Sequence, residues 1–246
     1  MQLKLKNRHG VQRTLTEEKY LIELKKNNWF SKLPELFQSR LLEQAGIVSI
    51  EKGQALFYAG DLFDGIYAVL EGAIGLGVTD IHGKEAVSVI AEPIIWFGEI
   101  SLVDQQPRSH HAIASKKSLL LHIPATFIHQ LLEEHPVFWF HLSQLMSQKL
   151  RYALLELFSI QTQTLQQRLA QRLLFILHGY GNHQVIETQT IQLSQEQLSQ
   201  MLMCSRQTIN QELQQLEKMQ ILKLAFKQIE ILDLAKLKQL ASTQIY

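Results

Sequence analysis

Cysteine is almost absent from this chain of 246 residues, because Cys204 is the only one. A single cysteine excludes an intrachain disulfide and a cysteine-ligated iron–sulfur cluster within one chain. We therefore expect a reducing, cytoplasmic location. Long hydrophobic runs are also missing, since no uninterrupted apolar segment approaches the roughly 20 residues that span a membrane. The first residues lack the apolar core of a signal peptide, so we expect no membrane partner.

Neither sign of charge is in clear excess. The formal net charge is +1, from 24 Lys and Arg against 23 Asp and Glu. From residue 163 to the end, eight basic residues less six acidic ones leave a local charge of +2. Any contact with nucleic acid must then depend on a local patch rather than on overall basicity. The length allows two modest domains.

Glycine is missing between Gly98 and Gly179, whereas nine of the twelve glycines lie from Gly46 to Gly98. Short apolar runs and turn signals alternate within that glycine-rich region. This pattern predicts many short antiparallel strands in a sandwich or barrel. The runs cover residues 66–70, 74–76, 86–90 and 119–123. A helix is expected before them, over residues 29–44, with Pro34 near its start.

Pro136 opens a glycine-free segment that predicts one long helix to about Gln161. One set of its positions alternates spacings of four and three, which is a heptad seam. We favour a parallel dimer seam over the alternative, a helix packed only on its own domain. A neighbouring face is expected to contact the strand domain through Leu142, Leu145 and Leu154, and residues 161–164 are a plausible hinge. The seam consists of Trp139, Ser143, Met146, Leu150, Ala153, Leu157 and Ile160.

Two short helices joined by a tight turn are predicted over residues 194–216. Ser194 and Gln197 form a capping box for the first helix. Ser205 caps the second helix, whose buried face carries Ile209, Leu213 and Leu216 at helical spacing. This pattern is a helix-turn-helix, and residues 184–193 before it alternate like a small hairpin. Residues 221–233 predict a second hairpin, the wing of a winged helix.

The outer face of the second helix is rich in long, forked polar side chains, which suit hydrogen bonds to base edges in a major groove. Lys227 lies near the tip of the predicted wing, where it can contact a phosphate. We therefore expect the chain to bind double-stranded DNA. The residues assigned to DNA are Ser205, Arg206, Gln207, Asn210, Gln211 and Lys227.

Strands with clustered glycines, a long helix and a winged helix-turn-helix follow one another in this order. The chain resembles the cyclic-AMP receptor protein/Fnr family of bacterial transcription regulators. The resemblance is carried by the turn signals of residues 60–72, by residues 97–112, which look like the phosphate-binding cassette, and by residues 193–198 and 204–208. It implies an α+β chain: an antiparallel, jelly-roll-like β-roll with flanking helices, a long dimerisation helix and a winged helix-turn-helix. The corresponding domains are residues 1–136, 137–163 and 164–246.

The resemblance also implies ligands and partners. The effector would be cyclic AMP or a related nucleotide, and the protein would be a homodimer that binds a two-fold symmetric operator and contacts RNA polymerase. Gly98 would allow close approach of the ligand, while Glu99, Ile100 and Ser101 would begin a helical turn whose N–H groups face a phosphate. Arg108 and Ser109 would donate hydrogen bonds to that phosphate, and Glu99 would accept one from the ribose. In the purely structural alternative, Arg108 only pairs with Glu99.

Two departures from the family pattern affect specificity. Ala153 and Leu154 stand where nucleotide-binding members place two hydroxyl residues against the adenine, so we expect weak discrimination between bases. In the recognition helix, Gln207 and Gln211 stand where glutamate and arginine are common. We therefore expect a half-site that keeps one guanine, read by Arg206, but otherwise differs from the usual operator. Met203 stands where the turn often has glycine.

Other functions remain as alternatives. The same fold can act constitutively or sense a different anionic metabolite. A chain of another class would be a small-molecule-binding module or a jelly-roll metalloenzyme with a vestigial C-terminal domain. We expect no metal site, because the adjacent His110 and His111 would point to opposite faces of a strand. No nucleophile–base pair stands out, so we expect no enzyme activity.

Overall fold

The computed structural model describes residues 17–79, 85–183 and 189–241. It divides into two compact units, which are described separately. The first comprises Met1–Gln148 with Asn182–Gln184, and the second comprises Lys149–Gly181 with Val185–Tyr246. Across the described ranges, none of the helices is both long and apolar enough to cross a membrane.

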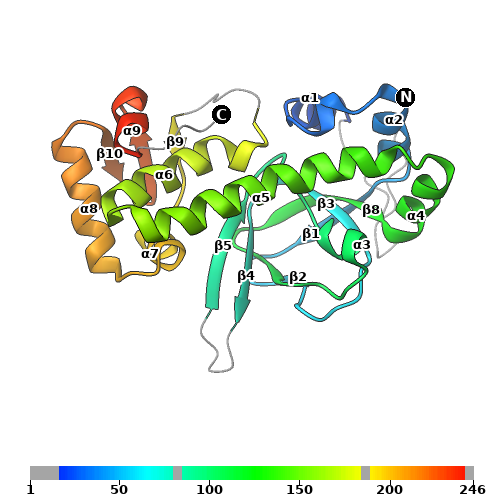
Figure 1. Cartoon of the computed structure of the whole chain (residues 1–246), viewed down its shortest axis with the longest axis horizontal. Coiled ribbons are helices and arrows are strands. Elements are labelled where there is room, and N and C mark those ends of the chain that lie inside the picture. Colours follow the sequence, from blue (N-terminus) through cyan, green and yellow to red (C-terminus); the bar gives the residue numbers. More distant parts are fainter. Residues whose placement is uncertain (1–16, 80–84, 184–188, 242–246) are drawn as a thin grey trace. The chain divides into compact units, whose positions relative to one another are not determined.

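The first unit contains two four-stranded antiparallel sheets, ordered β1-β8-β3-β6 and β2-β7-β4-β5 (Figure 1). This arrangement confirms the predicted antiparallel β-roll. The strands are β1 (Gly46–Ile50), β2 (Ala55–Phe57), β3 (Gly65–Glu71), β4 (Ile74–Thr79), β5 (Glu85–Ala91), β6 (Trp96–Phe97), β7 (His111–Ala114) and β8 (Ser118–Pro124).

The pairing of β3 with β8 brings together two residues that bear on the site. Tyr67 lies opposite His122 in the antiparallel register, and their rings stack with centroids 4.6 Å apart. At the start of β3, Gly65 has φ +147° and leaves no space for a side chain. A Cβ there would lie 2.1 Å from the carbonyl oxygen of Ile123. This glycine therefore lets the two strands approach closely.

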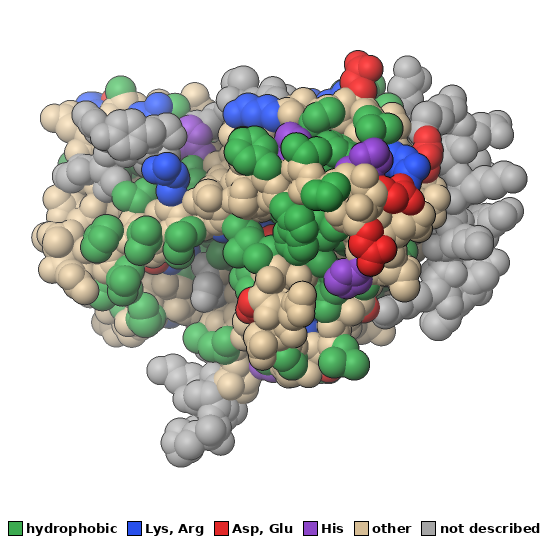
Figure 2. Space-filling model, turned by 45° about the vertical axis from the view of Figure 1, so that its right-hand side comes forward, with side chains coloured by type: hydrophobic (Ala, Val, Ile, Leu, Met, Phe, Trp, Pro, Cys, Tyr) green, Lys and Arg blue, Asp and Glu red, His purple; other side chains and the backbone are tan. Residues whose placement is uncertain are grey.

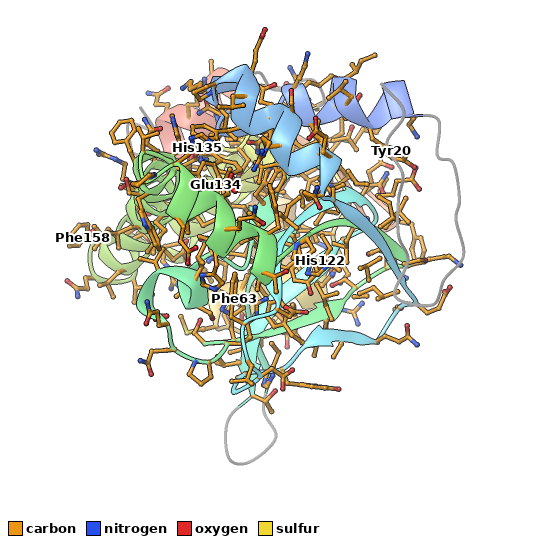
Figure 3. All side chains as sticks on the ribbon, turned by 90° about the vertical axis from the view of Figure 1, so that its right-hand side faces the viewer. Tyr20, Phe63, His122, Glu134, His135 and Phe158 are labelled. Atoms are coloured by element: carbon orange, nitrogen blue, oxygen red, sulfur yellow. The ribbon has the colours of Figure 1, made fainter. Side chains whose placement is uncertain are left out.

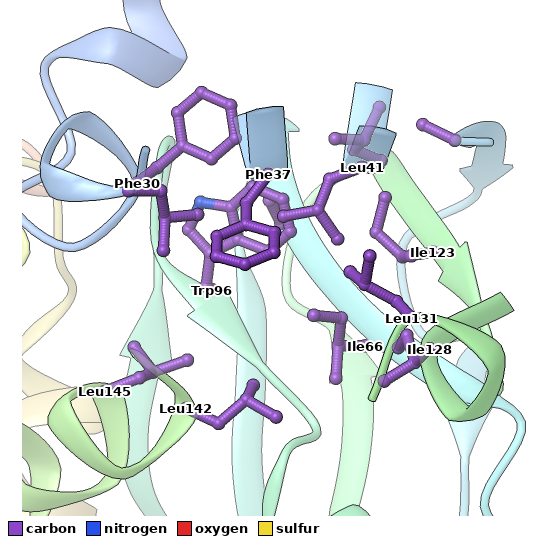
Figure 4. Close-up of a cluster of buried hydrophobic side chains, with 14 of the residues drawn as sticks. Phe30, Phe37, Leu41, Ile66, Trp96, Ile123, Ile128, Leu131, Leu142 and Leu145 are labelled. Atoms are coloured by element: carbon purple, nitrogen blue, oxygen red, sulfur yellow. The ribbon is translucent and has the colours of Figure 1, made fainter. Parts of the chain in front are cut away.

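Helices cover one side of the β-roll and enclose a hydrophobic core (Figure 4). Trp96 is fully buried there, with Phe30 stacked on it at 5.5 Å and Trp29 edge-on at 5.3 Å. Phe37 and Leu41 pack into the same cluster. The helices are α1 (Glu17–Lys25), η1 (Phe30–Lys32), α2 (Glu35–Glu43), α3 (Ile100–Asp104) and α4 (Ala125–Glu134).

The single helix predicted over residues 29–44 is wrong, because the segment forms two helices, η1 and α2. Leu33 between them is extended, with φ −65° and ψ +142°. The ring of Pro34 disfavours helical backbone in the residue before it, and Pro34 then begins α2 as its N-cap.

The predicted long helix is confirmed as α5 (Phe138–Thr162). Leu142 and Leu145 are buried in the core of the first unit, as expected. Leu154 belongs to the second unit and is 41% exposed, so its expected contact with the strand domain stays a prediction.

The second unit confirms a winged helix-turn-helix. Its sheet has the order β10-β11-β9, and β10 and β11 form the predicted wing. Part of the hairpin predicted over residues 184–193 lies outside the described residues, and the described strand β9 pairs with β11. The elements are α6 (Leu165–Leu177), η2 (Gly179–Gly181), β9 (Thr190–Ile191), α7 (Gln195–Leu202), α8 (Arg206–Lys218), β10 (Leu222–Ala225), β11 (Gln228–Ile231) and α9 (Leu234–Ala241).

Candidate ligand pocket and DNA-reading helix

The cassette begins with a backbone turn directly after β6. Gly98 has φ +100°, and a Cβ on it would lie 3.0 Å from Nη1 of Arg108 and 3.2 Å from the carbonyl oxygen of Gly65. Glu99 is the N-cap residue of α3, and its carbonyl oxygen accepts from the backbone N–H groups of Leu102 and Val103. The short helical turn predicted after Gly98 is therefore present. Ile100 is 37% exposed on it, while Glu99 and Ser101 are buried.

Arg108 is the central side chain of the candidate site and is only 3% exposed. Its Nη1 donates to the carbonyl oxygen of Gly98 at 2.7 Å, and its Nη2 donates to that of Gly65 at 2.6 Å. Nη2 also contacts Oδ1 of Asp64 at 2.6 Å, in a partly buried ion pair. The alternative in which Arg108 pairs with Glu99 is wrong, because Asp64 at the entrance to β3 supplies the carboxylate.

Aromatic rings surround the guanidinium group of Arg108. Its Cζ lies 4.3 Å from the ring centroid of Phe57, 5.0 Å from that of Phe63 and 5.9 Å from that of Tyr67. Figure 3 shows where Phe63 and His122 lie in the β-roll. A cation at this distance from the face of a ring is attracted by its quadrupole, more strongly where water is excluded. The rings thus hold a buried positive charge in one place.

Asp64 is bonded on both carboxylate oxygens. The hydroxyl of Tyr67 donates to Oδ2 at 2.6 Å, while Arg108 donates to Oδ1. Burial by itself would raise the pKa of Asp64. The hydrogen bonds from Tyr67 and Arg108, with the charges of Arg108 and His122, outweigh burial and hold this pKa below its usual range. Asp64 is therefore a fixed negative charge beside the arginine.

One donor of Arg108 has no acceptor. Its Nε is buried and makes no hydrogen bond to the residues that the structure describes. A buried donor without an acceptor costs about 1–3 kcal/mol. Ser109, the next residue, is exposed, and its Oγ lies 2.9 Å from Nδ1 of His110.

The two residues assigned to the base of a nucleotide are not part of this unit. Ala153 and Leu154 lie on α5 within the second unit, and both are exposed. The assignment therefore stays a prediction.

The helix-turn-helix has the predicted caps. The capping box of Ser194 and Gln197 is complete, and Oγ of Ser205 accepts from the backbone N–H of Thr208 at 3.1 Å. Met203 ends α7 in the left-handed conformation, with φ +54° and ψ +46°. Such backbone in a non-glycine residue costs roughly 1–2 kcal/mol.

The reading face of α8 is open. Arg206, Gln207 and Gln211 are exposed, as predicted for side chains that contact DNA. Asn210 is half-buried, and its Oδ1 accepts from Nε2 of Gln195 on α7 at 3.0 Å. This bond uses the amide oxygen of Asn210 as an acceptor.

Two arginines of α6, the half-buried Arg168 and the buried Arg172, fix the opposite side of the helix-turn-helix. Nη2 of Arg168 donates to the carbonyl oxygen of Leu202 at the end of α7. Arg172 pairs with Glu156 of α5 and also donates to the carbonyl oxygen of Met201. Cations at the carboxyl end of a helix satisfy its free carbonyl groups and favour its dipole.

Sequence reasoning missed three of these partners. It placed Asp64 only in a turn, and it assigned no role to Gln195 or to the pair of Glu156 with Arg172. None of them has a clear local signal, because α5 and α6 carry other charged and polar residues beside Glu156 and Arg172. Arg108 pairs with Asp64, and Asn210 pairs with Gln195 on the preceding helix. Each partner comes from another segment of the chain, so no local pattern predicts it.

Comparisons with known proteins agree with both units. A family model described as a cyclic nucleotide-binding domain matches residues 47–135, and one described as a Crp-like helix-turn-helix domain matches residues 167–240. The cyclic AMP receptor protein of Thermus thermophilus is 29% identical over 206 residues, which cover 83% of this chain and 88% of that protein. The CRP-like cAMP-activated global transcriptional regulator of Mycobacterium tuberculosis is 24% identical over 174 residues, 70% of this chain and 78% of that protein.

A solved structure extends the likeness over both units. A CRP/FNR-family transcriptional regulator of Thermus thermophilus is 26% identical, with a TM-score of 0.61 over 80% of this chain and 99% of that chain. The β-roll, the long helix and the helix-turn-helix are thus found together in the matched proteins. The chain belongs to the CRP/FNR family and is a transcription regulator with a cyclic-nucleotide-binding domain and a DNA-binding helix-turn-helix.

Proposed function

We propose that the protein is a homodimeric regulator whose binding to a two-fold symmetric DNA site is controlled by a cyclic nucleotide, cyclic AMP or a relative, in the β-roll. The observation that carries the ligand is the buried Nε of Arg108, which has no acceptor among the described residues. A phosphate oxygen is the acceptor that an arginine fork prefers. Gly98 and Ser109 flank this position and supply close backbone approach and a hydroxyl donor.

The exposed apolar residues of α5 support the dimer. Of the predicted seam, Trp139, Leu150, Leu157 and Ile160 are each at least 40% exposed in the single chain. Phe158, 56% exposed, points away from the helix on the same stretch (Figure 3). Hydrophobic side chains gather along one face in the space-filling view (Figure 2). Extended apolar surface of this kind marks an interface, and a second copy of α5 would cover it.

The base of the ligand is recognised weakly in this proposal. Ala153 and Leu154 have no side-chain donor or acceptor, so neither can discriminate adenine from guanine by hydrogen bonds. We therefore expect comparable affinities for cyclic AMP and cyclic GMP.

DNA is read by α8, with Arg206 on a guanine and Gln207, Asn210 and Gln211 on neighbouring base pairs. Each changed base pair should alter binding by about 1–3 kcal/mol. Two half-sites would lie about one helical turn apart. Lys227 and Ser205 would contact phosphates of the DNA backbone. RNA polymerase would be a further partner. The protein would act in the cytoplasm and would not catalyse a reaction.

A second candidate is a regulator that is constitutive or senses another anionic metabolite. The observation that favours it is the pair of Arg108 with Asp64, because an internal carboxylate already neutralises the arginine. A ligand phosphate must then bind beside Asp64 or displace it from Nη2. In either case, the free energy gained by binding the ligand must exceed the free energy lost by weakening the ion pair.

Calorimetric titration of the full chain with cyclic AMP and, separately, cyclic GMP distinguishes the two candidates. Saturable binding that weakens at least tenfold in Ser109→Ala and is lost in Arg108→Met would support the nucleotide sensor. No heat and no change in melting temperature with either nucleotide would contradict it and favour the second candidate.

DNA binding and dimerisation have separate tests. Arg206→Ala should lose specific binding to a site recovered by in vitro selection, while its melting temperature stays within 1 °C of the parent. Sedimentation should give a dimer, and Leu150→Asp with Leu157→Asp should give a monomer. A monomeric parent protein at micromolar concentration would contradict the proposed seam.

A further inference from the structure

The wing ends in an unusual pair of residues, Phe226 and Lys227. Phe226 is 90% exposed, more than any other large hydrophobic side chain of the described residues. Lys227 occupies the second position of the two-residue turn in the left-handed conformation, with φ +54°. Its Nζ lies 5.2 Å from the ring centroid of Phe226. An aromatic ring with a cation over it thus projects from the tip of the hairpin.

The wing is held firmly against the reading helix. Ile221 donates from its N–H to the carbonyl oxygen of Leu216 in α8, and the N–H of Leu224 donates to Oε1 of Glu217 at 2.8 Å. Ile229 and Ile231 of β11 are buried, which anchors the hairpin. A rigid base means that the position of the tip follows the position of α8, so a helix seated on DNA also places Phe226.

The length of the hairpin suits a groove next to the one that α8 reads. β10 has four residues, which span about 13 Å at roughly 3.3 Å per residue. The major groove is about 12 Å wide, and the minor groove beyond the phosphate strand is about 6 Å wide. Charge on the hairpin stem is balanced, because Lys223 lies opposite Glu230 in the register. The net positive charge is therefore at the tip, where Lys227 can meet a phosphate.

We infer that Phe226 is a wedge that enters the minor groove beside the half-site and unstacks one base step, while Lys227 neutralises the adjoining phosphate. The inference rests on the proposed reading of DNA by α8. Phenylalanine is among the side chains that open base steps from the minor groove and kink the duplex. The wedge adds specificity at a position outside the contacts of α8, because flexible pyrimidine–purine steps open more easily than A-tracts.

The test uses the full chain and a duplex recovered by in vitro selection, with 2-aminopurine placed at successive steps beside the half-site. Binding of the parent protein should raise 2-aminopurine fluorescence at one step. Phe226→Ala should abolish that rise and weaken binding about tenfold, in the range expected when one aromatic–base stack is lost. Phe226→Tyr should retain both. Folding is not at risk, since the side chain is exposed.

Salt dependence separates the wedge from a merely supporting role. Lys227→Ala should reduce the slope of log K against log salt concentration by about 0.9, as expected for one lost phosphate contact. Phe226→Ala should leave that slope unchanged. A slope that falls in Phe226→Ala, with no fluorescence change in the parent, would show that the ring only positions Lys227 and would overturn the wedge.

Two controls keep the proposals distinct. Leu36→Ala is the control, because it removes an exposed apolar side chain from the first unit rather than from the wing. It should change neither the 2-aminopurine fluorescence nor the affinity for DNA. If the parent protein and Arg206→Ala bind all duplexes alike, the reading by α8 fails. A third result would also overturn the wedge. In it, the parent binds DNA specifically and Phe226→Ala binds with the same affinity, but the variant no longer activates or represses RNA polymerase in vitro. The tip of the wing would then contact protein rather than DNA.

Discussion

The two units place their functional polar side chains in opposite environments. In the first unit, Arg108 and Glu99 are almost completely buried. In the second, Arg206, Gln207 and Gln211 are exposed on α8. A pocket for a small anion must hold its charges in place and shielded from water before the ligand arrives. A helix that reads DNA can leave its side chains hydrated, since the grooves are wet and the contacts spread over many groups.

This difference separates stability from binding. Substitution of Arg108 should lower both the free energy of unfolding and ligand affinity, because its Nη atoms hold the fold and its Nε would hold the ligand. Substitutions on the outer face of α8 should alter DNA affinity alone. All three tryptophans, Trp29, Trp96 and Trp139, belong to the first unit, so their fluorescence reports its unfolding selectively.

The largest effect is expected from Arg108→Met, which would remove the buried cation and leave Asp64 and two carbonyl groups without their donor. Breaking a buried ion pair from one side costs about 3–5 kcal/mol, although the 31% exposure of Asp64 places this pair at the lower end. Urea unfolding followed by tryptophan fluorescence measures the change. Arg206→Met is the matched control, with an expected change below about 0.5 kcal/mol. Equal losses in the two variants would break the contrast between the units.

Gly98→Ala should destabilise the first unit by about 2 kcal/mol, through a strained positive φ and a contact with Arg108. Gly53→Ala is the matched control: Gly53 also has a positive φ, +83°, but a Cβ there meets nothing within 4 Å. Its loss should be about 1 kcal/mol, from backbone strain alone. The difference between the urea midpoints of the two variants measures the cost of the contact between the new Cβ and Arg108. Identical midpoints would show that Arg108 shifts to accommodate the Cβ at no cost in stability.

The contrast also explains what could be predicted from the sequence. The caps at Ser194 and Ser205, the wing and the open face of α8 depend on residues within a few positions of one another, and all were predicted. The β-roll was likewise indicated by glycine spacing. The partner of Arg108 was not, because Asp64 lies 44 positions away and only the closure of the two sheets brings it near. The split between η1 and α2 was also missed, since Pro34 was expected near the start of one helix rather than at the boundary between two.

Met203→Gly should stabilise the second unit by about 1 kcal/mol. Met203 is 72% exposed and left-handed at the end of α7, so glycine would remove backbone strain without losing buried surface. Part of the gain is offset by the greater freedom of glycine in the unfolded chain. Calorimetry of the thermal unfolding of the second unit measures the effect. The tryptophan-detected unfolding of the first unit should not change, and a shift there would mean that the two units unfold together.

Acid should act on the first unit through Asp64, with a smaller effect than any of these substitutions. Burial tends to raise the pKa of Asp64, but its bonds with Tyr67 and Arg108 keep this pKa low in the folded state. The ion pair therefore stabilises the folded protein above the usual pKa of an aspartate, and this contribution is lost as the pH falls through the folded pKa. Glu71 and Glu134 also have lowered pKa values, so the parent curve alone is not specific. Asp64→Asn removes only the carboxylate of the pocket. The difference between the urea midpoints of parent and variant should be larger at pH 7 than at pH 3, when both are followed by tryptophan fluorescence. A difference that does not depend on pH would mean that Asp64 holds Arg108 by geometry rather than by charge, and the contrast in charge burial between the two units would then not account for the stability of the pocket.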